Sequence, residues 1–112
     1  MILTNYKIIK KLVEKYTNIK DLSIPKHNKM LTLSRCIYYQ LCFDYQGKKY
    51  SHTEASKTIN REHHNSNYGL KSFDKFYGQN FFKEYANIYV DCSMDLLELE
   101  VKINTIVLEQ TK

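Results

Sequence analysis

Apolar side chains in the first part of the chain recur every three or four residues, which is the spacing of one face of an α-helix. The first stripe has lysines between its members, which are Ile8, Ile9, Leu12 and Tyr16. Thr4 or Asn5 carries a side chain that can cap such a helix. The pattern predicts an amphipathic helix that runs to about Tyr16, followed by a loop over residues 17–29 that contains Pro25.

A second helix is predicted to start between Leu31 and Arg35 and to run to about Tyr45. Its apolar face is wide enough for burial on several sides and comprises Ile37, Tyr38, Tyr39, Leu41, Cys42 and Tyr45. We expect Gly47 to end this helix, because glycine readily takes the left-handed conformation just past a helix C-terminus.

A short helix is predicted next, with Ser51 or Thr53 as its cap and an end near Ile59. Ser51 and Glu54 have the spacing of a capping box, in which two side chains satisfy exposed backbone amides reciprocally. Asn60-Arg61 then interrupts the helical pattern. This order of a short helix and a tight break is the first half of a helix-turn-helix unit.

The second half is a helix predicted from about Glu62 to Phe76 or Tyr77. Its buried face is predicted to hold Ser66, Leu70, Phe73 and Tyr77, and its opposite face carries His63, His64, Asn67 and Lys71. Gly78-Gln79-Asn80 separates it from a long last helix over about 81–110, whose apolar positions are Ile88, Cys92, Leu96, Leu99, Ile103, Ile106 and Val107. The chain has one proline and three glycines, too few for a turn-rich β-domain, so the expected fold is all-α.

At 112 residues the chain is expected to form a single domain over 1–112. We divide it into an N-terminal helix and basic loop (1–30), a helix-turn-helix core (31–77) and a C-terminal helix (78–112). No apolar run is long enough to cross a bilayer or to resemble a secretory signal. Three cysteines without metal-type or disulfide-type spacing indicate reduced thiols and a cytoplasmic protein.

Charge is distributed unevenly along the chain, whose net charge is +5. Residues 1–75 hold fourteen Lys and Arg against six Asp and Glu, whereas residues 76–112 hold three against six. A basic body favours an anionic partner such as nucleic acid, although ordinary solubility charge is the alternative explanation. The acidic last helix either covers the core of the domain or pairs with a second copy to form a homodimer.

No motif supports catalysis, a cofactor or a metal ion, and we expect a non-enzymatic protein. Adjacent residues such as His63 and His64 point about 100° apart on a helix, whereas metal-binding histidines need to converge. The chain has no Cys-x-x-Cys pair, and its glycines are isolated, so it lacks a phosphate-binding loop. The segment Arg61-Glu62-His63-His64-Asn65 is instead suited to DNA. Asn can pair with an adenine edge, Glu can accept from cytosine, and Arg suits guanine or a phosphate.

Residues 34–76 resemble the C-terminal DNA-binding domain of the bacterial replication initiator DnaA (domain IV), which has a TrpR-like helix-turn-helix. The likeness is greatest to stand-alone relatives in small phage-type proteins. Arg35 opens a helix as in that family, and Ser51 and Glu54 match its short helix. The signature G-R-D-H-[TSA]-T-V-x-[HY]-[AG]-x-[KR]-x-[FI] corresponds to Asn60–Phe73, with Arg61, His63, Tyr68, Gly69, Lys71 and Phe73 in register.

The resemblance implies that particular residues contact DNA. Bases would be read by Glu62, His63, His64 and Asn65; the DNA backbone would be held by Arg35 and Arg61; and a basic loop would reach a phosphate or the minor groove through Lys26, His27 and Lys29. Lys71 joins them as a phosphate contact. The ATP-binding module of the initiator has no counterpart in this chain, so no nucleotide cofactor is implied.

Two positions depart from the family pattern, so the initiator's target sequence does not carry over. Asn65 stands where threonine is usual, and Ser66 stands where a buried valine is usual. A serine there is expected to lose roughly 1–3 kcal/mol of apolar burial unless Leu70 and Phe73 compensate.

Two functions follow from these observations. The leading hypothesis is a double-stranded DNA-binding protein, a phage-type regulator of replication or transcription that acts in the cytoplasm of its host. The alternative is a protein-interaction or virion-associated protein that keeps the helix-turn-helix fold without reading sequence.

Overall fold

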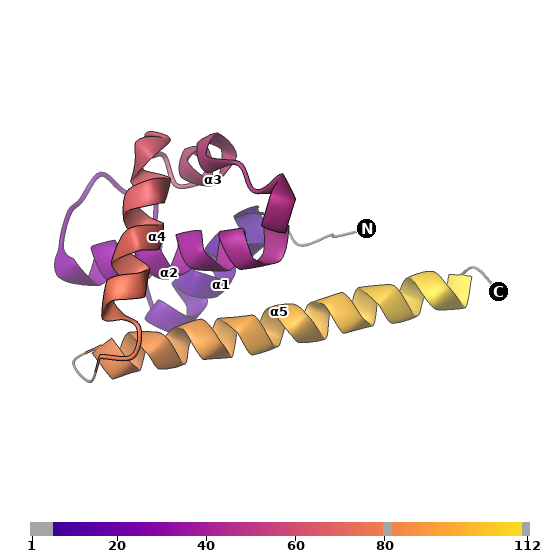
Figure 1. The fold of residues 1–112 in the computed structure, drawn as a ribbon. Coiled ribbons are helices and arrows are strands. Elements are labelled where there is room, and N and C mark those ends of the chain that lie inside the picture. The colour runs from indigo at the N-terminus through magenta and orange to yellow at the C-terminus, as the bar shows by residue number, and fades with distance from the viewer. Residues whose placement is uncertain (1–5, 80–81, 111–112) are drawn as a thin grey trace.

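The computed structural model describes residues 6–79 and 82–110. Within that part of the chain every regular element is helical, which confirms the all-α fold (Figure 1). The elements in chain order are α1 (Tyr6–Thr17), α2 (Lys29–Gln46), the short 3₁₀ helix η1 (Gly47–Lys49), α3 (His52–Thr58), α4 (His64–Phe76) and α5 (Lys83–Gln110). The predicted caps of the first helix, Thr4 and Asn5, lie outside the described residues.

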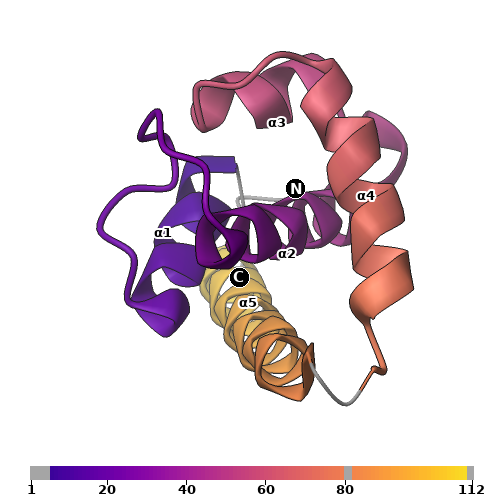
Figure 2. The same ribbon diagram turned by 90° about the vertical axis from the view of Figure 1, so that its left-hand side faces the viewer.

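Helix α2 is the centre of the fold. In Figure 2 it runs through the middle of the molecule, with α1 and α4 on opposite sides, α3 above and α5 below. It packs directly against α1, α4 and α5. This explains why its buried positions are on several faces, as the broad apolar pattern predicted; they run almost unbroken from Leu31 to Cys42.

The ends of α2 are set by local chemistry. The Asn28 side chain accepts a hydrogen bond from the backbone N–H of Leu31 (2.8 Å), so the helix begins at Lys29, two residues before the predicted window. Gly47 ends it as predicted, with a φ of 54° and its N–H donated to the Phe43 carbonyl. The Ser51 cap of α3 is also confirmed, because its hydroxyl accepts from the Glu54 N–H at 3.2 Å.

Helix α4 begins at His64, two residues later than predicted. Asn60 takes a left-handed φ of 55°, which turns the chain away from α3. The backbone N–H of Arg61 then donates to the Ser56 carbonyl (2.8 Å), which keeps the next residues outside the helix. The buried face holds Ser66, Gly69, Phe73 and Phe76. Tyr77 was predicted to lie on this face, but it follows the end of α4 and is 41% exposed.

Helix α5 lies against the body with its first half and extends past it with its second (Figure 1). Cys92 and Leu96 are fully buried, and Tyr16 of α1 donates a hydrogen bond to the Asp95 carboxylate (2.6 Å). At 28 residues the helix is about 42 Å long, which exceeds the length of the surface it covers. The predicted apolar face is therefore buried only in part, and Ile106 is exposed.

All three cysteines are buried as free thiols, in agreement with the prediction of reduced thiols, and they pack as small apolar side chains. Over the described residues, none of the helices has the length and apolar character needed to cross a membrane.

Candidate nucleic-acid interface

The first turn of α4 and the residues before it form a polar, exposed surface. Glu62, His63 and His64 are all exposed. The Nδ1 atom of His64 lies 3.4 Å from a Glu62 carboxylate oxygen, a contact that becomes an ion pair when the imidazole is protonated. In proteins that have a helix-turn-helix unit, the first turn of the second helix is the part that presents side chains to the major groove.

Asn65 is less accessible than its neighbours. It is half-buried, and its side-chain amide lies 3.4 Å from the Glu62 carbonyl, to which it donates a weak hydrogen bond. Its side-chain oxygen is not part of that hydrogen bond. Reading an adenine edge takes one donor and one acceptor from the amide, and the second N–H of Asn65 and its side-chain oxygen can supply them.

The basic loop between α1 and α2 lies beside this turn. Lys26, His27 and Lys29 are all exposed. His27 lines the same cavity as Arg61 and Asn65, so the loop and the start of α4 are neighbours in space although they are far apart in the sequence. Lys71, which lies further along α4, is exposed as well.

Arg35 does not lie on this surface, which contradicts its expected contact with the DNA backbone. The side chain is only 7% exposed. It donates three hydrogen bonds to loop carbonyls: Nε to Leu22 (2.9 Å), Nη1 to Lys26 (3.0 Å) and Nη2 to Ile24 (2.7 Å). Burial and, secondly, the nearby charge of Arg61 lower the pKa of Arg35 below its ordinary value. Arg35 therefore holds the basic loop in place from beneath.

Arg61 also holds the basic loop through one of its hydrogen bonds. Its Nη2 donates to the Ile24 carbonyl at 2.8 Å, and its Nη1 lies 3.4 Å from the Asn60 carbonyl. Its Nε is buried and has no hydrogen-bond partner among the described residues. The side chain is half-buried, so it retains some accessible surface next to the basic loop.

Ser66 has a different role from the one that its position suggested. It is fully buried, but its hydroxyl lies 2.7 Å from Nδ1 of His52 and also hydrogen-bonds the hydroxyl of Tyr50. Burial raises the pKa of Tyr50 well above its ordinary value. The expected loss of apolar packing is therefore replaced by a part-buried polar contact that joins Tyr50, which follows η1, to α3 and α4.

Tyr68 was not predicted as a site residue. It is 62% exposed, and it lines the cavity shared by the basic loop and α4. The available signal was its spacing, because a residue four positions after His64 lies on the same face of the helix.

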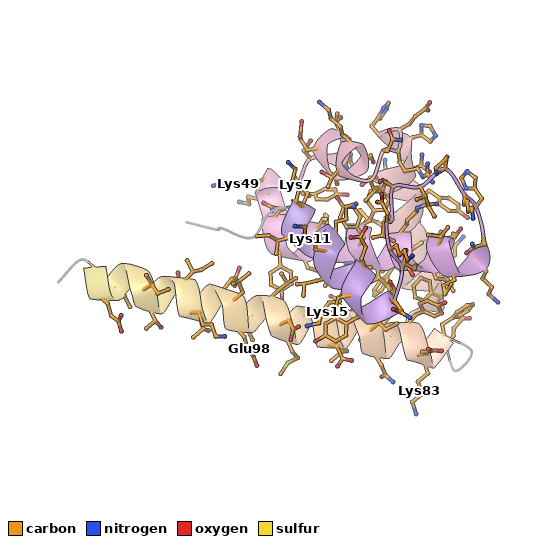
Figure 3. The ribbon with its side chains drawn as sticks, turned by 180° about the vertical axis from the view of Figure 1, so that it is seen from behind. Lys7, Lys11, Lys15, Lys49, Lys83 and Glu98 are labelled. Atoms are coloured by element: carbon orange, nitrogen blue, oxygen red, sulfur yellow. The ribbon has the colours of Figure 1, made fainter. Side chains whose placement is uncertain are left out.

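Cationic side chains also occur away from this surface. Lys7, Lys11 and Lys15 form a row along α1, seen from behind in Figure 3. All three are exposed, as are Lys48 and Lys49 of η1. The basic character of the body is thus spread over several faces. The candidate interface differs in combining charge with exposed imidazole and carboxylate groups beside the half-buried amide of Asn65.

No protein-family model, curated protein or solved structure matches this chain. Among residues 6–79 and 82–110, no three His, Cys, Asp or Glu side chains lie close enough together to hold a metal ion.

Proposed function

We propose that this protein is a non-enzymatic double-stranded DNA-binding protein and a relative of the DnaA C-terminal domain. It would be a phage-type regulator of replication or transcription that acts in the host cytoplasm. The single observation that carries the proposal is the position of the basic loop beside the polar first turn of α4. Two arginines hold that loop through its backbone carbonyls, which leaves Lys26, His27 and Lys29 directed to the surface.

Phosphate contacts would supply most of the affinity. Lys26, Lys29 and Lys71 are exposed around the α4 turn, and Lys48 and Lys49 extend the cationic surface along η1. Each neutralised phosphate releases counterions, so the logarithm of affinity falls with the logarithm of salt concentration at a slope of about −0.9 per contact. Sequence preference would come from Glu62, His63, His64 and Asn65, whose groups match the donors and acceptors of base edges.

Helix α5 would pair two copies of the protein. Its first half covers the core, but its outward face carries an apolar seam of 44–65% exposed side chains: Val90, Met94, Leu97, Val101 and Leu108. The intervals of four, three, four and seven residues are those of a coiled-coil seam, in which a second helix fills the spaces between side chains. Two copies would bind the two halves of a symmetric DNA site.

The test of DNA binding is a fluorescence-anisotropy titration with a pool of random duplexes at two salt concentrations, followed by sequencing of the bound fraction. We expect binding that weakens with salt and an enriched motif. The motif should disappear in a His63→Ala, Asn65→Ala double variant. A matched control, Lys102→Ala with Thr105→Ala, removes two exposed polar side chains from α5 and should leave the motif intact.

Absence of binding even at low salt would refute this function. The exposed seam on α5 would then favour the second candidate, a protein-interaction or virion-associated protein that retains the fold. Binding that is strong but shows no enriched motif would also contradict the proposed reading of bases by α4.

Sedimentation equilibrium tests the pairing of α5. We expect a dimer that dissociates in Leu97→Asp but persists in Lys102→Gln, an exposed position on the same helix where the change in charge is equal. Asp91, Glu98 and Glu100 flank the seam, so salt should strengthen the dimer while it weakens DNA binding. A wild-type protein that stays monomeric at high concentration would refute the pairing.

A further inference from the structure

A cavity of about 210 Å³ lies where the basic loop, α2 and α4 meet. Each of these elements contributes to its walls, and so does the turn before α4. The lining residues are His27, Thr32, Arg35, Cys36, Tyr39, Arg61, Asn65, Tyr68 and Gly69. The set includes cations and several hydrogen-bond donors, but no carboxylate.

The chain has only two arginines, and both line this cavity, whereas none of the lining residues is a lysine. Arg35 and Arg61 each donate to the carbonyl oxygen of Ile24, at 2.7 and 2.8 Å. Neither makes an ion pair within the part of the chain that the structure describes. Two guanidinium groups thus lie close together without a counter-charge. Buried charge is costly unless it is paired, and Arg35, which is buried, has no counter-charge among the described residues; an anion in the cavity would supply one.

The hydrogen bonding of the pair is incomplete as well. A guanidinium has five N–H groups, and Arg61 uses Nη1 and Nη2 on backbone carbonyls while its Nε remains buried without a partner in the described chain. Thr32, His27 and Tyr68 add further polar atoms around the same space. Guanidinium groups match the oxygens of phosphate in two-point geometry, which lysine does not.

We propose that this cavity binds a small phosphate-type oxyanion, either inorganic phosphate or the head of a small phosphomonoester. The ligand would lie between the loop and α4 and supply the missing negative charge. The inference places a small-molecule site within the proposed DNA interface, but binding of the free anion does not require that DNA binding be correct. Occupancy would fix the loop against α4 and so set the geometry of the surface that carries Lys26 and Lys29.

Inorganic phosphate is the probe for the first test, compared with chloride at equal ionic strength. Because the chain has only two arginines, the side-chain Nε–Hε region of its ¹⁵N NMR spectrum contains two signals, from Arg35 and Arg61. We expect both signals to shift along a saturable curve with phosphate, and the melting temperature to rise over the same range. Unchanged signals and an unchanged melting temperature would overturn the inference.

Asn65→Asp is the decisive variant because it places a carboxylate in the cavity without changing the size of the side chain. We expect it to shift the arginine signals in the absence of phosphate and to weaken phosphate binding at least tenfold. Asn67→Asp adds the same charge two residues further along α4 at an exposed position and serves as the matched control. Equal loss of phosphate binding in both variants would show a general charge effect and refute the site.

A DNA titration of the same two signals separates the possible sources of the phosphate group. Signals that respond to duplex DNA but not to free phosphate would assign the cavity to the DNA backbone, which overturns the inference and leaves the proposed function intact. Saturable phosphate binding in a protein that fails to bind DNA would support the inference and refute the proposed function.

Discussion

The guanidinium groups of Arg35 and Arg61 share one acceptor, the backbone carbonyl oxygen of Ile24, at 2.7 and 2.8 Å. One arginine comes from the middle of α2 and the other from the turn before α4, so this carbonyl connects three segments that are distant in sequence. The connection is made through backbone atoms of the loop. Its side chains at Lys26, His27 and Lys29 therefore remain available to a partner.

Replacing Arg35 is expected to destabilise the fold. Lysine has a single ammonium group and cannot reproduce three hydrogen bonds in the directions of Leu22, Ile24 and Lys26. We expect Arg35→Lys to lower the free energy of unfolding by about 1.5–3 kcal/mol, the range for a hydrogen bond to a charged group. Urea unfolding measures the change. Lys71→Ala, which removes an exposed cation from α4, should have little effect, and equal stability of both variants would contradict the role of Arg35 in holding the basic loop.

Ser66→Val is expected to destabilise the protein, although valine is the usual residue at this position in the DnaA-type pattern. Valine would leave the part-buried Tyr50 hydroxyl and Nδ1 of His52 without their shared partner. The expected cost is about 1–3 kcal/mol in urea unfolding, because unsatisfied buried polar groups lose their solvation. Thr53→Val, a change at an exposed position of α3, is the control. If Ser66→Val stabilised the protein instead, the apolar burial lost at Ser66 would outweigh its hydrogen bonds.

Gly69→Ala should be poorly tolerated for a steric reason. A Cβ atom at this position would lie 2.5 Å from Cδ2 of Tyr39, whose own hydroxyl is fixed by a 3.0 Å hydrogen bond to Ser56. Overpacking of this kind costs about 1–3 kcal/mol, despite the higher helix propensity of alanine. Thermal unfolding compares it with Ser72→Ala on the same helix, which should be near neutral. A Gly69→Ala protein as stable as the wild type would show that Tyr39 has room to move.

Acid should weaken the fold through Asp21. Hydrogen bonds from the hydroxyl and N–H of Ser23, together with the ion pair to Lys10, lower the pKa of Asp21 from 3.8 to about 2. Because the folded pKa is the lower one, this stabilisation is present above about pH 4 and is lost as pH falls toward 2.

The measurement is the urea midpoint as a function of pH for wild type and Asp21→Asn. The difference between them should be constant near neutral pH and shrink between pH 4 and 2. Asp74→Asn, an exposed carboxylate on α4, provides the comparison. A difference that persists at pH 2 would contradict the assignment.

The three thiols are expected to react only when the protein opens. Burial raises the pKa of Cys36 to about 11 and that of Cys92 to about 12, and it raises the pKa of Cys42 further. A thiol-reactive dye at pH 8 should therefore label the folded protein slowly, with all three cysteines modified rapidly in denaturant. Fast labelling of a single cysteine under native conditions would identify a local opening that the structure does not show.

The sequence predicts the elements whose ends are determined locally. Gly47 and Ser51 mark helix ends through interactions with residues three or four positions away, and both predictions are confirmed. The start of α4 was placed too early because its position depends on the contact between Arg61 and Ser56, which only the folded turn creates. Local pattern thus predicts where a helix is favoured, and nonlocal hydrogen bonds decide where it begins.

Roles within the candidate site were harder to predict than its location. Arg35 and Arg61 have the same chemistry in the sequence, but one is buried beneath the loop and the other is half-buried at the turn. Burial of a cation depends on which carbonyls converge on it, and those of Leu22, Ile24 and Lys26 come from a loop without periodic pattern. The DNA contacts themselves stay predictions.

The overhang of α5 makes resistance to hydrogen exchange uneven along a single helix. Amides around Cys92 and Leu96 lie against the body and should exchange only when the whole protein unfolds. Residues 101–106 are largely exposed, and their amides should exchange by fraying of the helix end, many times faster. Any partner that covers the outer seam would slow exchange in that stretch first. Hydrogen exchange in the second half of α5, measured by mass spectrometry, would therefore detect association before the partner is known.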